Sequence, residues 1–277
     1  MKSTSANAGA PASHADAWTF RTPRARLALW FGWLALVALF VYCWRVMNAD
    51  TMWVFVADAP RQAADLGSRM WPPSLTYLPE LLAPLWDTLN IATLGTVGGV
   101  IMAVPVAFLT ARNTTPSRLW VRPVALWVIV TSRSINSLIW ALLLVAVLGP
   151  GLLAGVVAIA LRSIGFVGKL LYEAIEETDA RQVEAISATG ASAAQRLDYA
   201  IVPQVMPAFW AIALFRWDIN IRESTILGLV GAGGIGLKLQ ASINVLAWPQ
   251  VATILLVILA TVLVSEWVSA RVRQAIM

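Results

Sequence analysis

Long apolar runs separated by short polar segments are the feature of this chain that most restricts its fold. A helix needs about 20 mainly apolar residues to cross the hydrocarbon core of a bilayer. About six runs approach or exceed this length. They cover residues 28–47, 85–110, 123–148, 152–171, 204–230 and 251–270. The sequence therefore predicts an all-α fold, a polytopic transmembrane helical bundle with about six spans.

The composition excludes the alternative of a water-exposed globule. Hydrophobic residues make up 59% of the chain, charged residues only 13%, and the mean hydropathy is +0.72. A soluble domain carries about 25% charged residues. The chain thus has too little polar surface to cover a globule in water.

The basic residues predict the orientation of the spans. The net charge of +5 would also suit a nucleic-acid partner, but the arginines are grouped at the ends of apolar runs, at 21–26, 112–122 and 271–273. This grouping is the positive-inside pattern of a protein in a lipid membrane, and it does not indicate a nucleic-acid partner. We expect a multi-pass protein of the cytoplasmic (inner) membrane, with both the N-terminus and the C-terminus in the cytoplasm.

Polar segments divide the chain into regions. Residues 1–27 are rich in Ala and Ser, lack the pattern of a signal peptide, and are interpreted as a flexible cytoplasmic tail. Residues 28–84 hold the first span and a proline-rich periplasmic segment, for which a short helix on the membrane surface is one option. Residues 85–270 form the transmembrane core, which includes a polar cytoplasmic segment at 172–203.

A helix-turn-helix pattern lies within this cytoplasmic segment. The chain reads Glu-Ala-Ile-Ser-Ala-Thr-Gly from Glu184, and Ile-Val-Pro at 201–203. Gly190 permits a sharp turn, and Pro203 suits the first turn of the next helix. The result would be a helical knob that docks into a groove on a partner protein, whereas the simpler alternative is an ordinary acidic loop.

This segment resembles the coupling motif of ABC importer permeases. Glu184, Ala185, Gly190 and Pro203 fall at the matching positions. The positions that depart from the motif carry other apolar residues, namely Ile186, Ala200 and Val202. The resemblance implies that Glu184, Ala185, Gly190 and Pro203 couple the chain to an ATPase.

Further segments resemble the permeases of phosphonate and phosphite importers. They are residues 133–135, 140–142, 162–169 and 215–236. The resemblance implies a type I ABC importer permease, two ATPase subunits, a periplasmic substrate-binding protein, and a second permease copy as a homodimer or with a close paralogue. Arg162 stands where many relatives have His, and Asp218 where Glu is common, so phosphate stays open beside phosphonate and phosphite.

A glycine-rich segment spells a nucleotide-binding pattern without its structural context. Gly231, Gly233 and Gly236 form G-x-G-x-x-G, but no strand precedes them, and Leu237 interrupts the Gly-Lys pair of a P-loop. We therefore expect no cofactor on this chain, with ATP and Mg used by partner ATPase subunits. Gly231, Gly233, Gly234 and Gly236 are interpreted as a gating bend, or as a simple turn.

Enzymatic and passive functions fit the sequence less well. The chain has one histidine, His14, and one cysteine, Cys43, so we expect no metal site, no internal disulfide and no catalytic residues. A membrane enzyme such as a lipid phosphatase would need a histidine, a clustered acid pair or a metal. A channel or secondary carrier would not need the coupling motif.

Ionisable residues inside spans are costly and mark functional positions. Four arginines against Asp218 and Glu223 leave an excess of positive charge, which suits an oxyanion because guanidinium groups match phosphoryl oxygens. Asp218 and Arg222 are also spaced to form a structural pair on one helix face. The alternative is that the arginines only neutralise acids and stabilise the bundle. The candidates for the substrate path are Arg133, Arg162, Arg216, Asn220 and Arg222.

Overall fold

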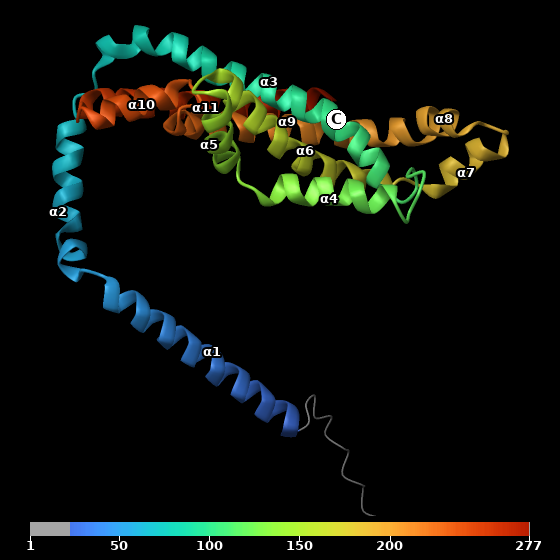
Figure 1. Cartoon of the computed structure of the whole chain (residues 1–277), viewed down its shortest axis with the longest axis horizontal. Coiled ribbons are helices and arrows are strands. Elements are labelled where there is room, and N and C mark those ends of the chain that lie inside the picture. Colours follow the sequence, from blue (N-terminus) through green and yellow to red (C-terminus); the bar gives the residue numbers. More distant parts are fainter. Residues whose placement is uncertain (1–22, 277) are drawn as a thin grey trace, which may run out of the picture. The chain divides into compact units, whose positions relative to one another are not determined.

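The computed structural model describes residues 23–276, which are mainly helical and contain no strand. They fall into two units, Met1–Ala63 and Ala64–Met277. The elements, labelled in Figure 1, are α1 (Pro23–Asp50), α2 (Trp53–Met70), η1 (Leu75–Tyr77), α3 (Leu78–Thr110), α4 (Val121–Ser134), α5 (Ser137–Leu148), α6 (Leu152–Glu176), α7 (Ala180–Ala188), α8 (Ala193–Arg196), η2 (Leu197–Ile201), α9 (Val202–Leu227), η3 (Gly228–Val230), α10 (Ile235–Asn244) and α11 (Trp248–Ile276).

The first unit holds α1 and the start of α2. The predicted tail at 1–27 lies mostly outside the described residues, but its last residues, from Pro23 onward, already belong to α1. The helix α2 occupies part of the segment for which a short surface helix was one option. Its residues are exposed and mix apolar side chains with charged ones.

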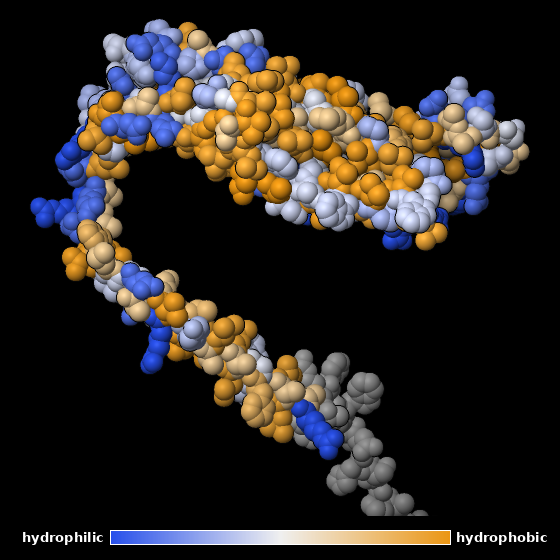
Figure 2. Space-filling model, in the orientation of Figure 1, coloured by the Kyte–Doolittle hydropathy of each residue, from blue (hydrophilic) through white to orange (hydrophobic). Residues whose placement is uncertain are grey.

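The number of membrane-spanning helices agrees with the sequence prediction. Among the described residues, five helices are long and apolar enough to cross a membrane, and the bent pair α4 and α5 raises the number to six if it forms one span. In the second unit, apolar side chains cover the middle of the bundle, whereas polar ones gather near its ends (Figure 2). This distribution fits an apolar belt between two polar surfaces.

The span predicted at 123–148 is a bent pair of helices and not a straight one. The helices α4 and α5 meet at an angle of 90° around Ile135 and Asn136. Asn136 adopts an extended backbone and caps α5, because its side-chain oxygen accepts a hydrogen bond from the Leu138 amide at 3.1 Å. A polar cap inside an apolar run is thus what interrupts this span.

Small residues hold the centre of the bundle together. Gly95 and Gly99 of α3 lie directly against Ile159, Ala160 and Ser163 of α6. Small side chains let two helices approach closely in a membrane. The α3–α6 pair therefore forms a rigid centre, on which α4, α5 and α9 pack.

Candidate functional site

The cytoplasmic segment of the sequence prediction forms a protruding helical hairpin. The helices α7 and α8 extend from one end of the second unit, the end opposite to α10 (Figure 1). Glu184 and Ala185 are exposed on α7, and Gly190 turns the chain with a φ of 80°. No atom lies within 4 Å of a side-chain carbon placed on Gly190, so its backbone angle, rather than space, requires glycine.

Caps define the two helices of this hairpin. Asp179 caps α7 and accepts hydrogen bonds from the Arg181 amide and guanidinium, at 3.0 to 3.2 Å. The Arg181 side chain, followed by its backbone amide, lowers the pKa of Asp179. Ser192 and Gln195 form a capping box on α8. The hairpin is thus folded by its own local sequence.

The base of the hairpin is tied to the bundle by polar contacts. Gln204, in the first turn of α9 with Pro203, accepts a hydrogen bond from the Asp179 amide at 2.9 Å. On the other side, Glu176 accepts from the Arg112 amide at 2.9 Å and lies 3.6 Å from the Arg122 guanidinium. A displacement of α7 would therefore reach α9, α6 and the loop after α3.

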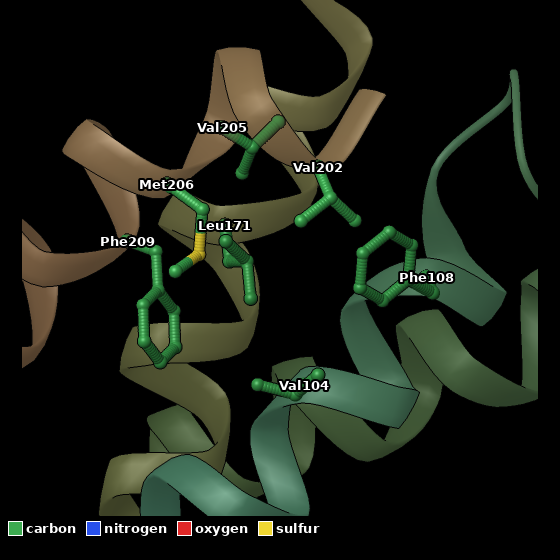
Figure 3. Close-up of a pocket in the computed structure, with 7 residues that line it drawn as sticks. All are labelled: Val104, Phe108, Leu171, Val202, Val205, Met206 and Phe209. Atoms are coloured by element: carbon green, nitrogen blue, oxygen red, sulfur yellow. The ribbon is translucent and has the colours of Figure 1, made fainter. Parts of the chain in front are cut away.

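An apolar cavity of about 210 Å³ lies beside this base. Figure 3 shows its lining side chains gathered around one space between α3, α6 and α9. They are Val104, Phe108, Leu171, Val202, Val205, Met206 and Phe209. Because all seven side chains are apolar, this cavity offers nothing to bind an oxyanion.

A buried polar cluster joins α3, α6 and α9. Arg216 has a side-chain exposure of 1%, donates to Ser163 Oγ at 3.0 Å, and lies 3.4 Å from a Glu223 oxygen. Arg162 lies 3.7 Å from the other oxygen of Glu223. Asn220 donates to the hydroxyls of Thr96 at 2.7 Å and Ser163 at 3.1 Å. This arrangement is called the α6–α9 cluster below, and its members are Thr96, Arg162, Ser163, Arg216, Asn220 and Glu223.

A second charged group joins α9 to α11. Arg222 contacts Asp218 on the same helix and lies 3.3 Å from Glu266 of α11. Ser265 donates to the other oxygen of Asp218 at 2.8 Å. The sequence reasoning missed Glu266, although a carboxylate inside the last apolar run is a sufficient signal. These four residues are called the α9–α11 cluster.

Arg133 differs from the other three arginines. It is exposed in the last turn of α4, directly before the bend, and no ion pair involves it in the part of the chain that the structure describes. Ser132, beside it, accepts a hydrogen bond from the Gly165 amide at 2.8 Å and donates to the Leu161 carbonyl. Ser132 thus holds the end of α4, and with it the backbone of Arg133, against α6.

The glycine-rich segment forms a bend at the opposite end from the hairpin. Gly231, Gly233 and Gly234 have φ angles of 88°, 85° and 72°. Gly236 lies in the first turn of α10, a helix that the sequence reasoning missed, and packs against the backbone of Thr225 and Gly228. The bend places the Ile235 amide 2.8 Å from Thr88 Oγ1 of α3. Within residues 23–276, no three His, Cys, Asp or Glu side chains are grouped to hold a metal.

Known proteins resemble the chain over most of its length. Residues 95–276 match the family model described as the inner membrane component of binding-protein-dependent transport systems. The phosphite transport system permease protein PtxC of Stutzerimonas stutzeri is 41% identical over 234 residues, which cover 84% of this chain and 83% of that protein. The phosphate-import permease protein PhnE of Mycolicibacterium smegmatis is 40% identical over 240 residues, which cover 87% of this chain and 44% of that protein.

Solved structures share the fold. A chain of the MetNI methionine ABC transporter in an inward-facing conformation superposes with a TM-score of 0.64 and 20% identity, over 74% of this chain and 99% of its own length. A chain of an amino acid ABC transporter gives a TM-score of 0.62 and 22% identity, over 73% and 96%. The predicted type I importer permease fold is thereby confirmed.

Proposed function

Because the chain belongs to the family of inner membrane components of binding-protein-dependent transport systems, matched over residues 95–276, we propose that it carries phosphite and phosphonate oxyanions inward through an ATP-driven importer. It is a multi-pass membrane protein and a transporter subunit. The observation that carries the substrate assignment is the 41% identity with a phosphite permease over four fifths of both chains.

The hairpin of α7 and α8 is the proposed ATPase dock. It protrudes from the bundle, exposes Glu184 and Ala185, and is folded by its own caps. Docked in a groove on an ATPase subunit, it would pass the closure of the two ATPase subunits to α9 through the contact of Asp179 with Gln204. We propose that the hairpin, the loop at 111–122 and both termini lie in the cytoplasm, because arginines are grouped in or near them.

The partners follow from this arrangement. The chain carries no P-loop in its sequence, so ATP and Mg would be bound by two separate ATPase subunits. A periplasmic binding protein would deliver the oxyanion at the other face. Arg222 and Glu266 are about half exposed on the surface of the single bundle, although they lie within spans. The exposure of charged side chains to lipid costs free energy, which supports a second permease copy over this surface.

The substrate path is proposed to pass Arg133, Arg162, Arg216 and Asn220. Arg133 has no ion-pair partner among the described residues, and the two arginines of the α6–α9 cluster share one carboxylate. Arg222 is instead paired with two carboxylates, so we assign it to the structural role it shares with Asp218. The glycines between Gly231 and Gly236 would serve as the bend around which the periplasmic end moves.

Phosphate is the second candidate substrate. It is favoured by the 40% identity with a phosphate-import permease, although that match covers less than half of the relative. Phosphite and phosphate are both tetrahedral oxyanions, and guanidinium groups bind either. The distinction therefore has to be made by measurement.

Uptake by the assembled importer tests the proposal. The permease, its ATPase subunits and the binding protein would be reconstituted in vesicles, and labelled phosphite, methylphosphonate and phosphate compared with and without ATP. We expect ATP-dependent uptake of phosphite or methylphosphonate, and no ATP hydrolysis by the purified permease alone. Preferential uptake of phosphate would select the second candidate, and no uptake of any of the three would refute the substrate class.

A further inference from the structure

The α6–α9 cluster contains one more positively charged side chain than negatively charged ones. Two guanidinium groups, of Arg162 and Arg216, share the single carboxylate of Glu223 in the described part of the chain. The other contacts of Arg216 are neutral, since it donates to Ser163 and lies 5.2 Å above the ring of Phe166. A buried cation without a full counter-charge is costly, so the cluster favours an additional anion.

The contacts with Glu223 are also longer than those of a tight ion pair. Its oxygens lie 3.4 Å from Arg216 and 3.7 Å from Arg162. Charge-assisted hydrogen bonds between guanidinium and carboxylate are usually about 2.7–2.9 Å long. Glu223 is thus shared by two arginines and forms a short ion pair with neither of them.

One part of the cluster is buried, and another part is partly exposed. Arg216 and Asn220 are buried and are held by the hydroxyls of Ser163 and Thr96. In contrast, 27% of the Arg162 side chain and 17% of the Glu223 side chain are exposed. A solute that reached this part of the bundle would meet Arg162 and Glu223 before Arg216.

An unused acceptor lies in the same buried part of the cluster. The side-chain oxygen of Asn220 is buried and has no hydrogen-bond partner among the described residues. The Asn220 nitrogen is already committed to Thr96, whose own hydroxyl donates to the Ala92 carbonyl. The oxygen therefore needs a donor, and a buried polar atom of this kind calls for a bound water or ligand.

We propose that Glu223 is a built-in counter-anion that a passing phosphite or phosphonate displaces from Arg162. This inference rests on the proposed function and adds a role for one residue. The oxyanion binds the guanidinium groups of Arg162 and Arg216, and Glu223 competes with it for both. The hydroxyl of a singly protonated oxyanion is a suitable donor for Asn220.

Such competition is useful because transport requires a weak site. A solute must bind well enough to enter a path, yet weakly enough to leave it. Two free arginines would hold a phosphoryl group tightly. A neighbouring carboxylate can replace the solute at the same guanidinium groups. It thereby shortens the time for which the solute stays bound, without an added conformational step.

The test is the affinity of the complex for phosphite after removal of the Glu223 charge. The permease, purified with its ATPase subunits, would be titrated with labelled phosphite in the absence of binding protein. We expect Glu223→Gln to bind phosphite about tenfold more tightly than the wild type and to release it more slowly. At saturating phosphite, its maximal uptake rate should fall while its KM also falls.

Glu266→Gln is the matched control. It removes the same charge from a carboxylate that also contacts an arginine within the spans, but in the α9–α11 cluster. Its phosphite affinity should match that of the wild type. Equal affinities for Glu223→Gln, Glu266→Gln and the wild type would overturn the inference, as would a gain in both variants.

Variants of the partly exposed Arg162 keep the inference testable if Glu223→Gln does not assemble. Arg162→Gln should bind phosphite about tenfold more weakly, and Arg162→Lys should lie between it and the wild type, because charge survives without the fork. Wild-type affinity in Arg162→Gln would overturn the inference. A wild-type importer that takes up none of these oxyanions would instead refute the proposed function.

Discussion

Replacing Gly99 by alanine should loosen the centre of the bundle and the α6–α9 cluster together. A side-chain carbon on Gly99 would lie 2.5 Å from the Ser163 Cβ and 3.0 Å from the Ala160 carbonyl oxygen. Carbon atoms pack comfortably at about 3.5–4.0 Å, so α3 and α6 would have to separate by roughly 1 Å at this crossing. Neither contact is a flexible side-chain end that could move aside.

The magnitude follows from the cost of overpacking. Added methyl groups in a well-packed interior usually cost about 1–3 kcal/mol. At 1.4 kcal/mol per factor of ten, the unfolding equilibrium would shift by about 5- to 150-fold. Ser163 also accepts hydrogen bonds from Arg216 and Asn220, so its displacement should weaken oxyanion uptake.

The neighbouring glycine supplies the control. A side-chain carbon on Gly98 would meet only the Ala160 Cβ, at 3.8 Å, which is ordinary contact. Both variants would be titrated with SDS in mixed micelles and assayed for uptake in vesicles. Gly98→Ala should stay within about 0.5 kcal/mol of the wild type. Equal stability of Gly99→Ala and Gly98→Ala would refute the tight α3–α6 crossing.

Three further predictions concern the hairpin and the bend. Gly190 has a φ of 80°, a backbone region that asparagine tolerates better than valine does. The hairpin of Gly190→Val should therefore fold poorly, and this variant should retain ATPase subunits less well than Gly190→Asn. Equal co-purification of ATPase subunits with both variants would contradict this. Because the pKa of Asp179 is lowered in the folded protein, its carboxylate stabilises α7 fully at a pH above the ordinary pKa of 3.8. This stabilisation is lost as the pH falls through the lower pKa of the folded state. Hydrogen exchange of α7, corrected for intrinsic rates, should therefore show a pH dependence that Asp179→Ala lacks. Arg133→Ala should slow phosphite uptake in an intact complex and Arg133→Lys should restore part of it, whereas a parallel loss of detergent stability would indicate a structural role.

The sequence carried enough information for the spans and for the hairpin. Apolar runs of membrane length and the grouping of arginines depend only on local composition, and the turn at Gly190 depends on a local backbone preference. The bend at Asn136 was missed because one polar cap does not interrupt a hydropathy average. The helix α10 was missed because its ten residues are too few to span a membrane.

Spacing along one helix also predicts contacts within that helix. Asp218 and Arg222 are four residues apart, and they are paired in the structure. Arg162, in contrast, has no acid close to it in sequence, yet it lies beside Glu223 on another helix. Such a pair depends on how α6 and α9 cross, which a single sequence does not reveal.

The distribution of charged residues within the spans says more about anion binding than their net charge does. Counted along the sequence, four arginines against Asp218 and Glu223 indicate an excess of positive charge throughout the spans, and Glu266 reduces it. The structure divides the same charges into two groups of opposite character: the α6–α9 cluster has one carboxylate for two arginines, and the α9–α11 cluster has two carboxylates for one arginine. Of the two groups, only the first can gain by binding an anion, because a further anion beside Arg222 would face two carboxylates. Whether neutralising a carboxylate changes phosphite affinity therefore depends on the cluster that holds it, and not on the net charge of the spans.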